Sequence, residues 1–438
     1  MNSDFKPDAV VIGAGYVGLT LSLHLASKGL NILAVDNNEK VVKDLQKGKS
    51  SIYEKSIQST LKKCVQSEKI QFSTEAIAKG CNYWILAISY FPGDKSHYLR
   101  ALDNIKGFEN EAPTIMIRGT VPIGYLSQTI LPALEKRFAT KLDEGFYLAS
   151  APERSLSGAA LEELEDLPQI IGASDMSFMR ASSLFNKSGI HCIHLSNLEG
   201  GEIAKTFTNF ARLVQFNLSN YLGALCHKFD ISEEIMFNSV KEGYPRLNFL
   251  SSPGPGVGGF CLPKDSLVLY DGIMELFTKD SKTQAFVDFP KQQFELNQSI
   301  MQDHAKIVCK LLQGRSKILA MGMAFKGIPQ TDDIRDSVGV FIVKYLLQKD
   351  IQIEVFDRTV PLNKLNTLAL KVSEYPERLD EYDAVLLLNN DPKYRHFLQQ
   401  NIKTKDNSTI ALYDPWRLIV TGKETIFQSN FPKQNFNR

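Results

Sequence analysis

The chain has 438 residues, enough for two to three domains, and its 43% hydrophobic and 23% charged residues are typical of a globular protein. Fifty basic against forty-nine acidic residues leave a formal charge of +1, which excludes an overall attraction for nucleic acid or an anionic membrane. Six cysteines without a CxxC pair predict neither a disulfide framework nor a metal site, and the absence of a leader or of an apolar run of about 18 residues makes a cytoplasmic location without membrane contact the expectation.

The first 36 residues have the pattern of a βαβ unit. An apolar, β-branched run at 8–12 predicts a strand, a glycine turn follows, and apolar residues from Leu19 to about Gly29 predict a helix. A second strand at 31–35 ends at Asp36. This is the context in which a glycine turn can bind a dinucleotide.

The turn Gly13-Ala-Gly15-Tyr16-Val17-Gly18 has GxGxxG spacing. The first glycine permits the tight turn, the second allows close approach of a pyrophosphate, and the third allows the helix to pack on the strand. Asp36 lies where a carboxylate binds the ribose hydroxyls, and no arginine follows it directly, so NAD is favoured over NADP. Gly13, Gly15, Tyr16, Val17, Gly18 and Asp36 are the predicted cofactor-binding residues of this segment. The alternative is a glycine turn without a ligand.

The remainder predicts an α/β chain in three parts. Strands are expected at 83–88, 114–117 and 146–149, one long helix at 202–228, a glycine- and proline-rich segment at 251–265 that interrupts the region, and further helix to about residue 312. A second strand–helix–strand pattern occupies 317–321, 337–348, 353–356 and 384–388, and a loose polar tail ends the chain. The predicted fold is α/β, with two Rossmann-like doubly wound domains joined by a long central helix and a helical middle domain. The predicted boundaries are 1–199, 200–305 and 306–438.

Cys261 differs from the other five cysteines because it follows Gly254-Pro-Gly256-Val-Gly258-Gly259-Phe260. So many glycines predict a backbone that approaches a ligand closely. A thiol on such a segment can act as a nucleophile in its thiolate form. A buried cysteine beside a flexible loop is the alternative.

In this segment the sequence resembles the UDP-glucose, UDP-N-acetylhexosamine and GDP-mannose dehydrogenases, whose signature is similar to residues 253–265. The resemblance covers nearly the whole chain. Its further motifs are Val11-Ile-Gly-Ala-Gly-Tyr-Val-Gly-Leu19, Thr120-Val-Pro-Ile-Gly124, Pro152-Glu153-Arg154, Glu202-Ile-Ala-Lys205-Thr-Phe-Thr-Asn209, Ala324-Phe-Lys326 and Thr331-Asp-Asp-Ile-Arg335-Asp-Ser337.

The resemblance implies a four-electron oxidation of a UDP-sugar alcohol to a carboxylate. Cys261 would form a thiohemiacetal and then a thioester, while Lys205 and Asn209, one helical turn apart, would stabilise the negatively charged oxygen. Asp265, Glu153 and Thr120 would serve proton transfer and the positioning of water. Thr120 and Arg335 would also contact the cofactor. The implied substrate contacts are Arg154, Lys205, Asn209, Arg246, Gly258, Lys326 and Arg417, with Arg246 acting across a homodimer formed by the central domain.

Departures from the family pattern bear on the substrate. Pro152-Glu-Arg-Ser-Leu-Ser-Gly158 resembles the UDP-N-acetylhexosamine group, so UDP-N-acetylmannosamine or UDP-N-acetylglucosamine is expected, for surface polysaccharide synthesis. Arg118-Gly119 stands where many relatives have Lys-Ser, and residues 87–90 also differ. The alternatives are UDP-glucose 6-dehydrogenase activity, a two-electron hydroxyacid-type dehydrogenase, or a catalytically silent protein that binds a nucleotide sugar.

Overall fold

The computed structural model describes residues 5–94, 96–106, 112–277, 283–368, 371–373, 379–401 and 410–418. The chain forms two compact units, the first made of residues 1–209 and 267–290 and the second of residues 210–266 and 291–438. The polar tail expected from the sequence lies outside the described residues.

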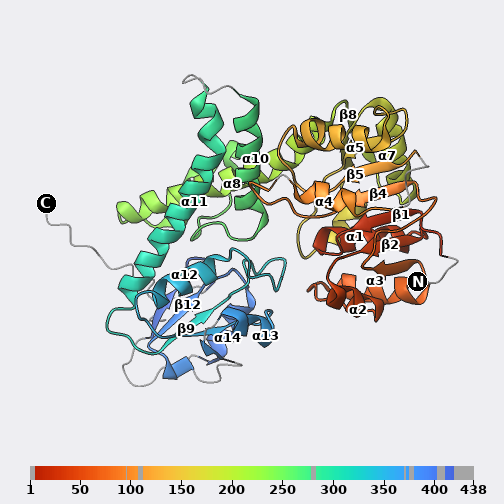
Figure 1. Cartoon of the computed structure of the whole chain (residues 1–438). Coiled ribbons are helices and arrows are strands. Elements are labelled where there is room, and N and C mark those ends of the chain that lie inside the picture. The colour runs from red at the N-terminus through yellow and green to blue at the C-terminus, as the bar shows by residue number, and fades with distance from the viewer. Residues whose placement is uncertain are drawn as a thin grey trace. The chain divides into compact units, whose positions relative to one another are not determined.

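The first unit contains an eight-stranded sheet with the order β3-β2-β1-β4-β5-β6-β7-β8 (Figure 1). Its strands are β1 (Ala9–Ile12), β2 (Ile32–Val35), β3 (Ile70–Ser73), β4 (Tyr83–Leu86), β5 (Thr114–Ile117), β6 (Tyr147–Ser150), β7 (Gln169–Gly172) and β8 (Cys192–Leu195). Neighbouring strands are parallel except β6 and β7. The strand order reverses direction at β1, whose carboxyl end is therefore the switch point where dinucleotides bind in such sheets.

Helices connect these strands. They are α1 (Tyr16–Ser27), α2 (Glu39–Gln46), α3 (Lys55–Gln66), α4 (His97–Asp103), the π-helical η1 (Leu126–Ile130), α5 (Leu131–Phe138), α6 (Ala160–Asp166) and α7 (Asp175–Lys187). Ser174 begins α7 by accepting the amide of Ser177, and Asn38 begins α2 by accepting two amides. Such side-chain acceptors satisfy amides that the first helical turn leaves without partners.

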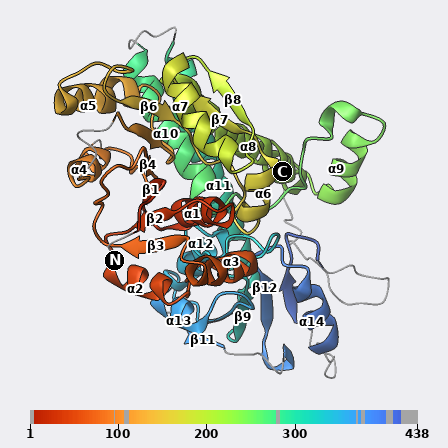
Figure 2. The same ribbon diagram turned by 90° about the vertical axis from the view of Figure 1, so that its right-hand side faces the viewer.

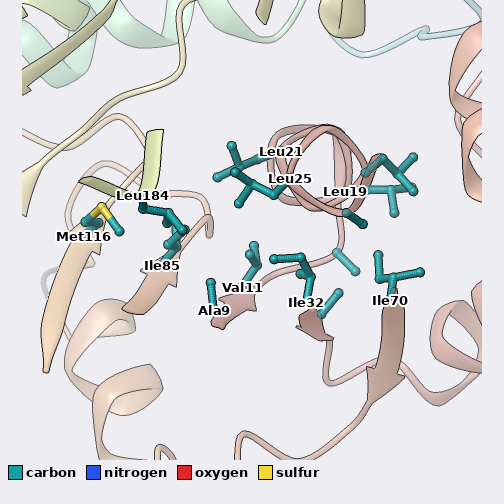
Figure 3. Packing of buried hydrophobic residues seen from close by; sticks show 14 of the residues in the cluster. Ala9, Val11, Leu19, Leu21, Leu25, Ile32, Ile70, Ile85, Met116 and Leu184 are labelled. Atoms are coloured by element: carbon teal, nitrogen blue, oxygen red, sulfur yellow. The ribbon is translucent and has the colours of Figure 1, made fainter. Parts of the chain in front are cut away.

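Both faces of this sheet are buried, because alternate residues of each strand point to opposite sides. Val11 and Ile32 pack with Leu19, Leu21 and Leu25 of α1, and Ile85 lies beside Leu184 in the same cluster, as Figure 3 shows. Their neighbours Val10, Leu33 and Trp84 belong to the opposite core, which also contains Tyr98 of α4 and Leu126. The continuous apolar strands of the sequence thus reflect burial on two sides.

The second unit contains a five-stranded parallel sheet with the order β11-β10-β9-β12-β13 (Figure 2). Its elements are β9 (Ile318–Met321), α12 (Val338–Leu347), β10 (Ile353–Phe356), α13 (Leu362–Leu365), η3 (Asn366–Leu368), β11 (Lys371–Val372), η4 (Leu379–Glu381), β12 (Ala384–Leu387), α14 (Lys393–Asn401) and β13 (Ala411–Tyr413). Ile318 and Ala320 face a core shared with α12, and Leu319 and Met321 face a core shared with α14. This is the second doubly wound sheet expected from the sequence.

The middle of the chain is helical. It consists of α8 (Leu198–Lys228), α9 (Glu233–Lys241), η2 (Pro245–Leu247), α10 (Cys261–Leu276) and α11 (Gln284–Leu311). The helices α8, α10 and α11 each contribute residues to both units. In the described ranges no helix combines the length and apolarity needed to cross a bilayer.

The predicted fold class is confirmed, with local differences. The strand at 114–117 has the expected bounds, and α8 ends at residue 228 as expected but begins at Leu198 rather than at Glu202. The strands β3, β7, β8, β11 and β13 were not expected, and β3, β7 and β8 carry polar residues. The expectation that the interrupting segment extends to Asp265 was wrong, since α10 begins at Cys261. Pro263 fits there because the first turn of a helix needs no amide from it.

Candidate active site

The glycine turn between β1 and α1 is built around backbone contacts that exclude side chains. A Cβ on Gly18 would lie 1.7 Å from the carbonyl oxygen of Gly13, and a Cβ on Gly13, whose φ is +96°, would lie 2.6 Å from the carbonyl oxygen of Ala87. A Cβ on Gly15 would meet no atom within 4 Å. Gly13 and Gly18 are therefore required by the turn itself, whereas Gly15 leaves an exposed backbone that a pyrophosphate can approach.

Asp36 closes the turn from the end of β2. Its Oδ2 accepts the amide of Ala14 at 2.9 Å, and its Oδ1 accepts the amide of Asn38 at 2.9 Å. The carboxylate is part-buried. Each oxygen retains acceptor capacity for a ribose hydroxyl, so the cradle and the carboxylate fit the adenosine half of NAD.

Tyr16 connects the glycine turn to two other segments. Its hydroxyl donates to Oε2 of the buried Glu54 at 2.7 Å and accepts the amide of Gly158 at 2.8 Å. Burial, reinforced by Glu54, raises the pKa of Tyr16 well above its usual range. The turn is thereby linked to the segment that ends at Gly158.

Replacing Tyr16 with phenylalanine is expected to lower the free energy of unfolding by about 1–3 kcal/mol. The change leaves a carboxylate oxygen of Glu54 and the amide of Gly158 without their partner. Urea unfolding measures the effect, and Tyr83→Phe is the matched control, because the Tyr83 hydroxyl makes no hydrogen bond within the described ranges. Equal unfolding free energies for the two variants would contradict the expectation.

Arg118 and Glu153 form a buried ion pair where β5 and β6 end. The Arg118 side chain is fully buried and also donates to Oε1 of Gln169 at 2.7 Å. Burial favours the neutral form of Glu153, but Arg118, the amide of Ser155 and Lys205 outweigh it, and the pKa of Glu153 lies below its usual range. The sequence marked Arg118 as a departure without assigning it a role.

Gly119, the other departure at this point, makes room for a tyrosine. A Cβ there would lie 2.1 Å from the hydroxyl of Tyr98 and 2.2 Å from the carbonyl oxygen of Ile88. The same hydroxyl donates to that carbonyl at 2.7 Å. The departures at residues 87–90 and 118–119 therefore form one packed arrangement.

The start of α8 lies beside the Thr120 turn. Glu202, one turn before Lys205 and two turns before Asn209, accepts the amides of Gly124 at 2.6 Å and Leu126 at 2.8 Å. Burial raises the pKa of Glu202 to about 8 against the opposing effect of these amides. Asn209 is buried and Lys205 part-buried. The first unit thus brings together the end of β5, the end of β6 and one face of α8.

The segment before Cys261 is held by the second unit. The side chain of Asn297 accepts the amide of Val257 at 2.7 Å and donates to its carbonyl at 2.9 Å. A Cβ on Gly258 would lie 2.9 Å from the carbonyl oxygen of Asp336, and one on Gly259, whose φ is +91°, would lie 2.7 Å from the Phe325 ring. Close packing inside the unit accounts for these two glycines.

Cys261 is the first residue of α10 and its side chain is exposed. The other cysteines are buried or part-buried, and burial raises the pKa of Cys81 and of Cys192 to about 11. All six cysteines lie in the described ranges. Cys261 is therefore the cysteine whose side chain is most accessible.

Charged groups surround the start of α10. The Arg335 guanidinium lies 4.7 Å from the centroid of the Phe260 ring and interacts electrostatically with Cys261. Asp333 binds Arg335 through three hydrogen bonds. Asp265 is buried one turn after Cys261 and pairs with Lys264 at 2.7 Å.

The other predicted substrate contacts occupy varied surroundings. Lys326 lies over the Phe325 ring at 5.3 Å, and exposed Arg246 lies over the Tyr244 ring at 5.4 Å. Arg417 pairs with Glu233 and donates to the carbonyl of Pro253 at 3.2 Å. Arg154 is part-buried beside Glu153. The described part of the chain contains no group of three or more potential metal ligands.

A glycine cradle at the switch point of one doubly wound sheet, together with a second such sheet, defines a dinucleotide-binding α/β protein. Comparison with known proteins then assigns it to a family. The NAD-binding domain of the UDP-glucose/GDP-mannose dehydrogenase family matches residues 8–187, its central domain residues 199–286, and its UDP-binding domain residues 319–419. The chain belongs to the UDP-glucose/GDP-mannose dehydrogenase family and is an NAD-dependent oxidoreductase.

Individual relatives are similar over most of their length. The UDP-N-acetyl-D-mannosamine dehydrogenase of Methanocaldococcus jannaschii is 26% identical, covering 97% of this chain and 94% of that protein. The UDP-N-acetyl-D-mannosamine dehydrogenase of Campylobacter jejuni is 28% identical, covering 86% of this chain and 94% of that protein. A solved structure from Pyrococcus horikoshii, a UDP-D-ManNAc dehydrogenase, has a TM-score of 0.78 at 22% identity and covers 96% of this chain and 98% of that one. At that identity the structure confirms the fold.

Proposed function

We propose that this enzyme oxidises the C6 hydroxyl of UDP-N-acetylmannosamine to a carboxylate in two steps, with Cys261 as the nucleophile. The observation that carries the proposal is the exposed thiol at the start of α10, on a backbone segment fixed by Asn297 and close glycine packing. UDP-N-acetylglucosamine and UDP-glucose remain alternative substrates.

NAD, when bound, accepts the hydride in each oxidation. After the first oxidation the sulfur of Cys261 forms a bond to the aldehyde carbon, giving a thiohemiacetal. The second oxidation converts this adduct to a thioester, and water then forms a bond to the carbonyl carbon as the carbon–sulfur bond breaks. One sugar alcohol, two NAD and one water thus give one carboxylate, two NADH and three protons.

The chain's own residues have distinct proposed roles. Lys205 and Asn209 stabilise the oxygen that becomes negative in the adduct, as hydrogen-bond donors on one face of α8. Asp265 assists proton transfer at the thiol, while Thr120 and Glu153 position and activate the water. Arg335 contacts the cofactor, and Arg154, Arg246, Gly258, Lys326 and Arg417 contact the substrate. Arginine suits the diphosphate because its planar guanidinium group can donate two parallel hydrogen bonds to phosphate oxygens.

The substrate assignment rests on two observations. Several relatives similar over most of this chain are named UDP-N-acetyl-D-mannosamine dehydrogenases. The Pro152–Gly158 segment has the form expected of that group. A relative of 28% identity from Bacillus subtilis is named a putative UDP-glucose 6-dehydrogenase, so UDP-glucose belongs in any test.

A panel of UDP-sugars with NADH detection tests the substrate. The N-acetylmannosamine sugar is expected to be oxidised fastest, and faster turnover of UDP-glucose would overturn the assignment. Binding of both ligands without any NADH would favour the silent-protein alternative. A hydroxyacid substrate would favour the two-electron alternative, which family membership disfavours.

We also propose that the protein is a homodimer and acts in the cytoplasm, where a reduced thiol persists, to supply an acidic sugar for surface polysaccharide. A row of exposed apolar residues on α8 supports the dimer. Leu218, Tyr221 and Leu225 follow one another at helical spacing, and Phe229 continues the row with 69% of its surface exposed. Large apolar patches of this kind mark protein interfaces.

The double variant Leu218→Glu and Tyr221→Glu is expected to be monomeric, because it places two charges in the proposed interface. Light scattering coupled to size-exclusion chromatography measures the mass. Met179→Glu on α7 is the matched control, since Met179 is 68% exposed on another helix. A dimeric double variant, or a monomeric wild type, would contradict the proposal.

A further inference from the structure

Arg118 carries a positive charge in the interior of the first unit. Its side chain has no exposed surface, and it donates to Glu153, to Oε1 of Gln169 and, at 3.4 Å, to the carbonyl of Ala151. Its Nε is buried without a partner among the described residues. A buried ion pair is weak evidence for stability, because desolvation offsets the attraction between the charges. Stability alone therefore does not account for the pair.

The carboxylate of Glu153 is held from two sides. Its Oε1 accepts the amides of Arg154 at 2.7 Å and Ser155 at 2.8 Å, and its Oε2 accepts a bond from Arg118. A carboxylate oxygen accepts two hydrogen bonds, so Oε2 keeps one acceptor position. Three donors thus fix the orientation of a carboxylate that can still bind one water.

Other charged and titratable groups lie near the Arg118–Glu153 pair. Lys205 of α8 acts on Glu153 together with Arg118, and both favour its ionised form. Arg154 and Glu163 of α6 line the same small cavity as Glu153, and the Glu163 carboxylate accepts the amide of Leu156 at 2.5 Å. Burial lowers the pKa of His24, whose ring is close enough to interact with Arg118. Arg118 is thus the cation in direct contact with Glu153.

We propose that Arg118 is the positioning residue of Glu153 in the hydrolytic half-reaction, fixing the carboxylate and holding it as an anion that accepts the proton of the attacking water. This rests on the function proposed above. As the water oxygen bonds to the thioester carbon, its proton passes to Oε2 of Glu153, and the sulfur of Cys261 leaves as a thiolate. The planar fork of arginine suits this role, because two of its nitrogens reach Glu153 and Gln169 at once.

The test follows breakdown of the covalent adduct rather than overall turnover. Enzyme mixed with NAD and UDP-N-acetylmannosamine is quenched at intervals, and intact-protein mass reports the acylated fraction between pH 5.5 and 8. In wild type, breakdown is expected to be independent of pH. In Arg118→Gln it is expected to slow by about tenfold per pH unit below the raised pKa of Glu153. The double variant Arg118→Gln and Glu153→Gln is expected to be slow without this pH dependence.

Arg118→Lys keeps the charge on a group that makes fewer simultaneous bonds. Arg118→Lys is expected to show the same slowing of adduct breakdown at low pH, beginning at a lower pH than in Arg118→Gln. If Arg118→Gln does not fold, Arg118→Lys tests the proposal in its place. Arg180→Gln, which removes an exposed arginine stacked on Tyr147, is the matched control and should behave as wild type. A wild-type profile in the folded Arg118 variants would overturn the proposal. Absence of any adduct both in wild type and in the folded Arg118 variants, in which breakdown is expected to be slow, would instead overturn the proposed function.

Discussion

Replacing Cys261 with serine is expected to lower the formation of the sugar acid by about three to four orders of magnitude while leaving the fold intact. The thiol is the proposed nucleophile, and a serine hydroxyl at neutral pH is a far weaker one. Because Cys261 is exposed at the start of α10, the change removes no core packing. The measurement is acid product per enzyme, with circular dichroism and thermal unfolding as tests of the fold.

Cys309→Ser is the matched control for that experiment. Cys309 is a part-buried cysteine of α11, also in the second unit, and has no proposed role in the chemistry. It should retain activity. Undiminished product formation by Cys261→Ser would show that the covalent mechanism is wrong, whereas equal losses in both variants would indicate a structural cause.

Alanine at Gly15 and alanine at Gly18 are expected to fail in different ways. A Cβ on Gly18 would lie 1.7 Å from the carbonyl oxygen of Gly13, so the turn and the start of α1 must shift. A large loss of unfolding free energy, about 3 kcal/mol or more, is expected with loss of NAD binding. A Cβ on Gly15 meets nothing within 4 Å, so this variant should fold as wild type.

Gly15→Ala is nevertheless expected to weaken NAD binding by at least about tenfold, because the methyl group occupies the space through which a pyrophosphate approaches the backbone. Calorimetric titration with NAD gives the dissociation constant, and thermal unfolding without NAD gives the stability. Wild-type affinity in Gly15→Ala would place the cofactor's phosphates elsewhere. Wild-type stability in Gly18→Ala would contradict the described packing of the turn.

The parts of the fold that the sequence predicted are those whose signals are local. The β1–α1–β2 unit follows from an apolar run, three spaced glycines and a terminal Asp36, all within 36 residues. The start of α10 was missed because the preceding glycines dominate the pattern, although Cys261 and the residues after it form a helical turn. The strands β7 and β8 were missed because pairing with neighbours, rather than composition, defines them.

The site residues also divide into those with a local sequence signal and those placed by long-range contacts. The residue types at positions 205, 209, 261 and 265 pointed to chemistry through their motifs. The pairing of Arg118 with Glu153 depends instead on β5 and β6 being neighbours, which places side chains 35 residues apart at adjacent strand ends. The anchoring of the Thr120 turn by Glu202 is equally a long-range contact. Such contacts carry no local pattern, and only the departure at Arg118 could have suggested one.

Counting NADH against UDP-N-acetylmannosamine consumed by the purified enzyme tests the central claim most directly. Capture of the aldehyde by the Cys261 sulfur, followed by a second oxidation on the same enzyme, predicts two NADH for each sugar and an acidic product. One NADH per sugar, with an aldehyde or ketone released, would contradict the account.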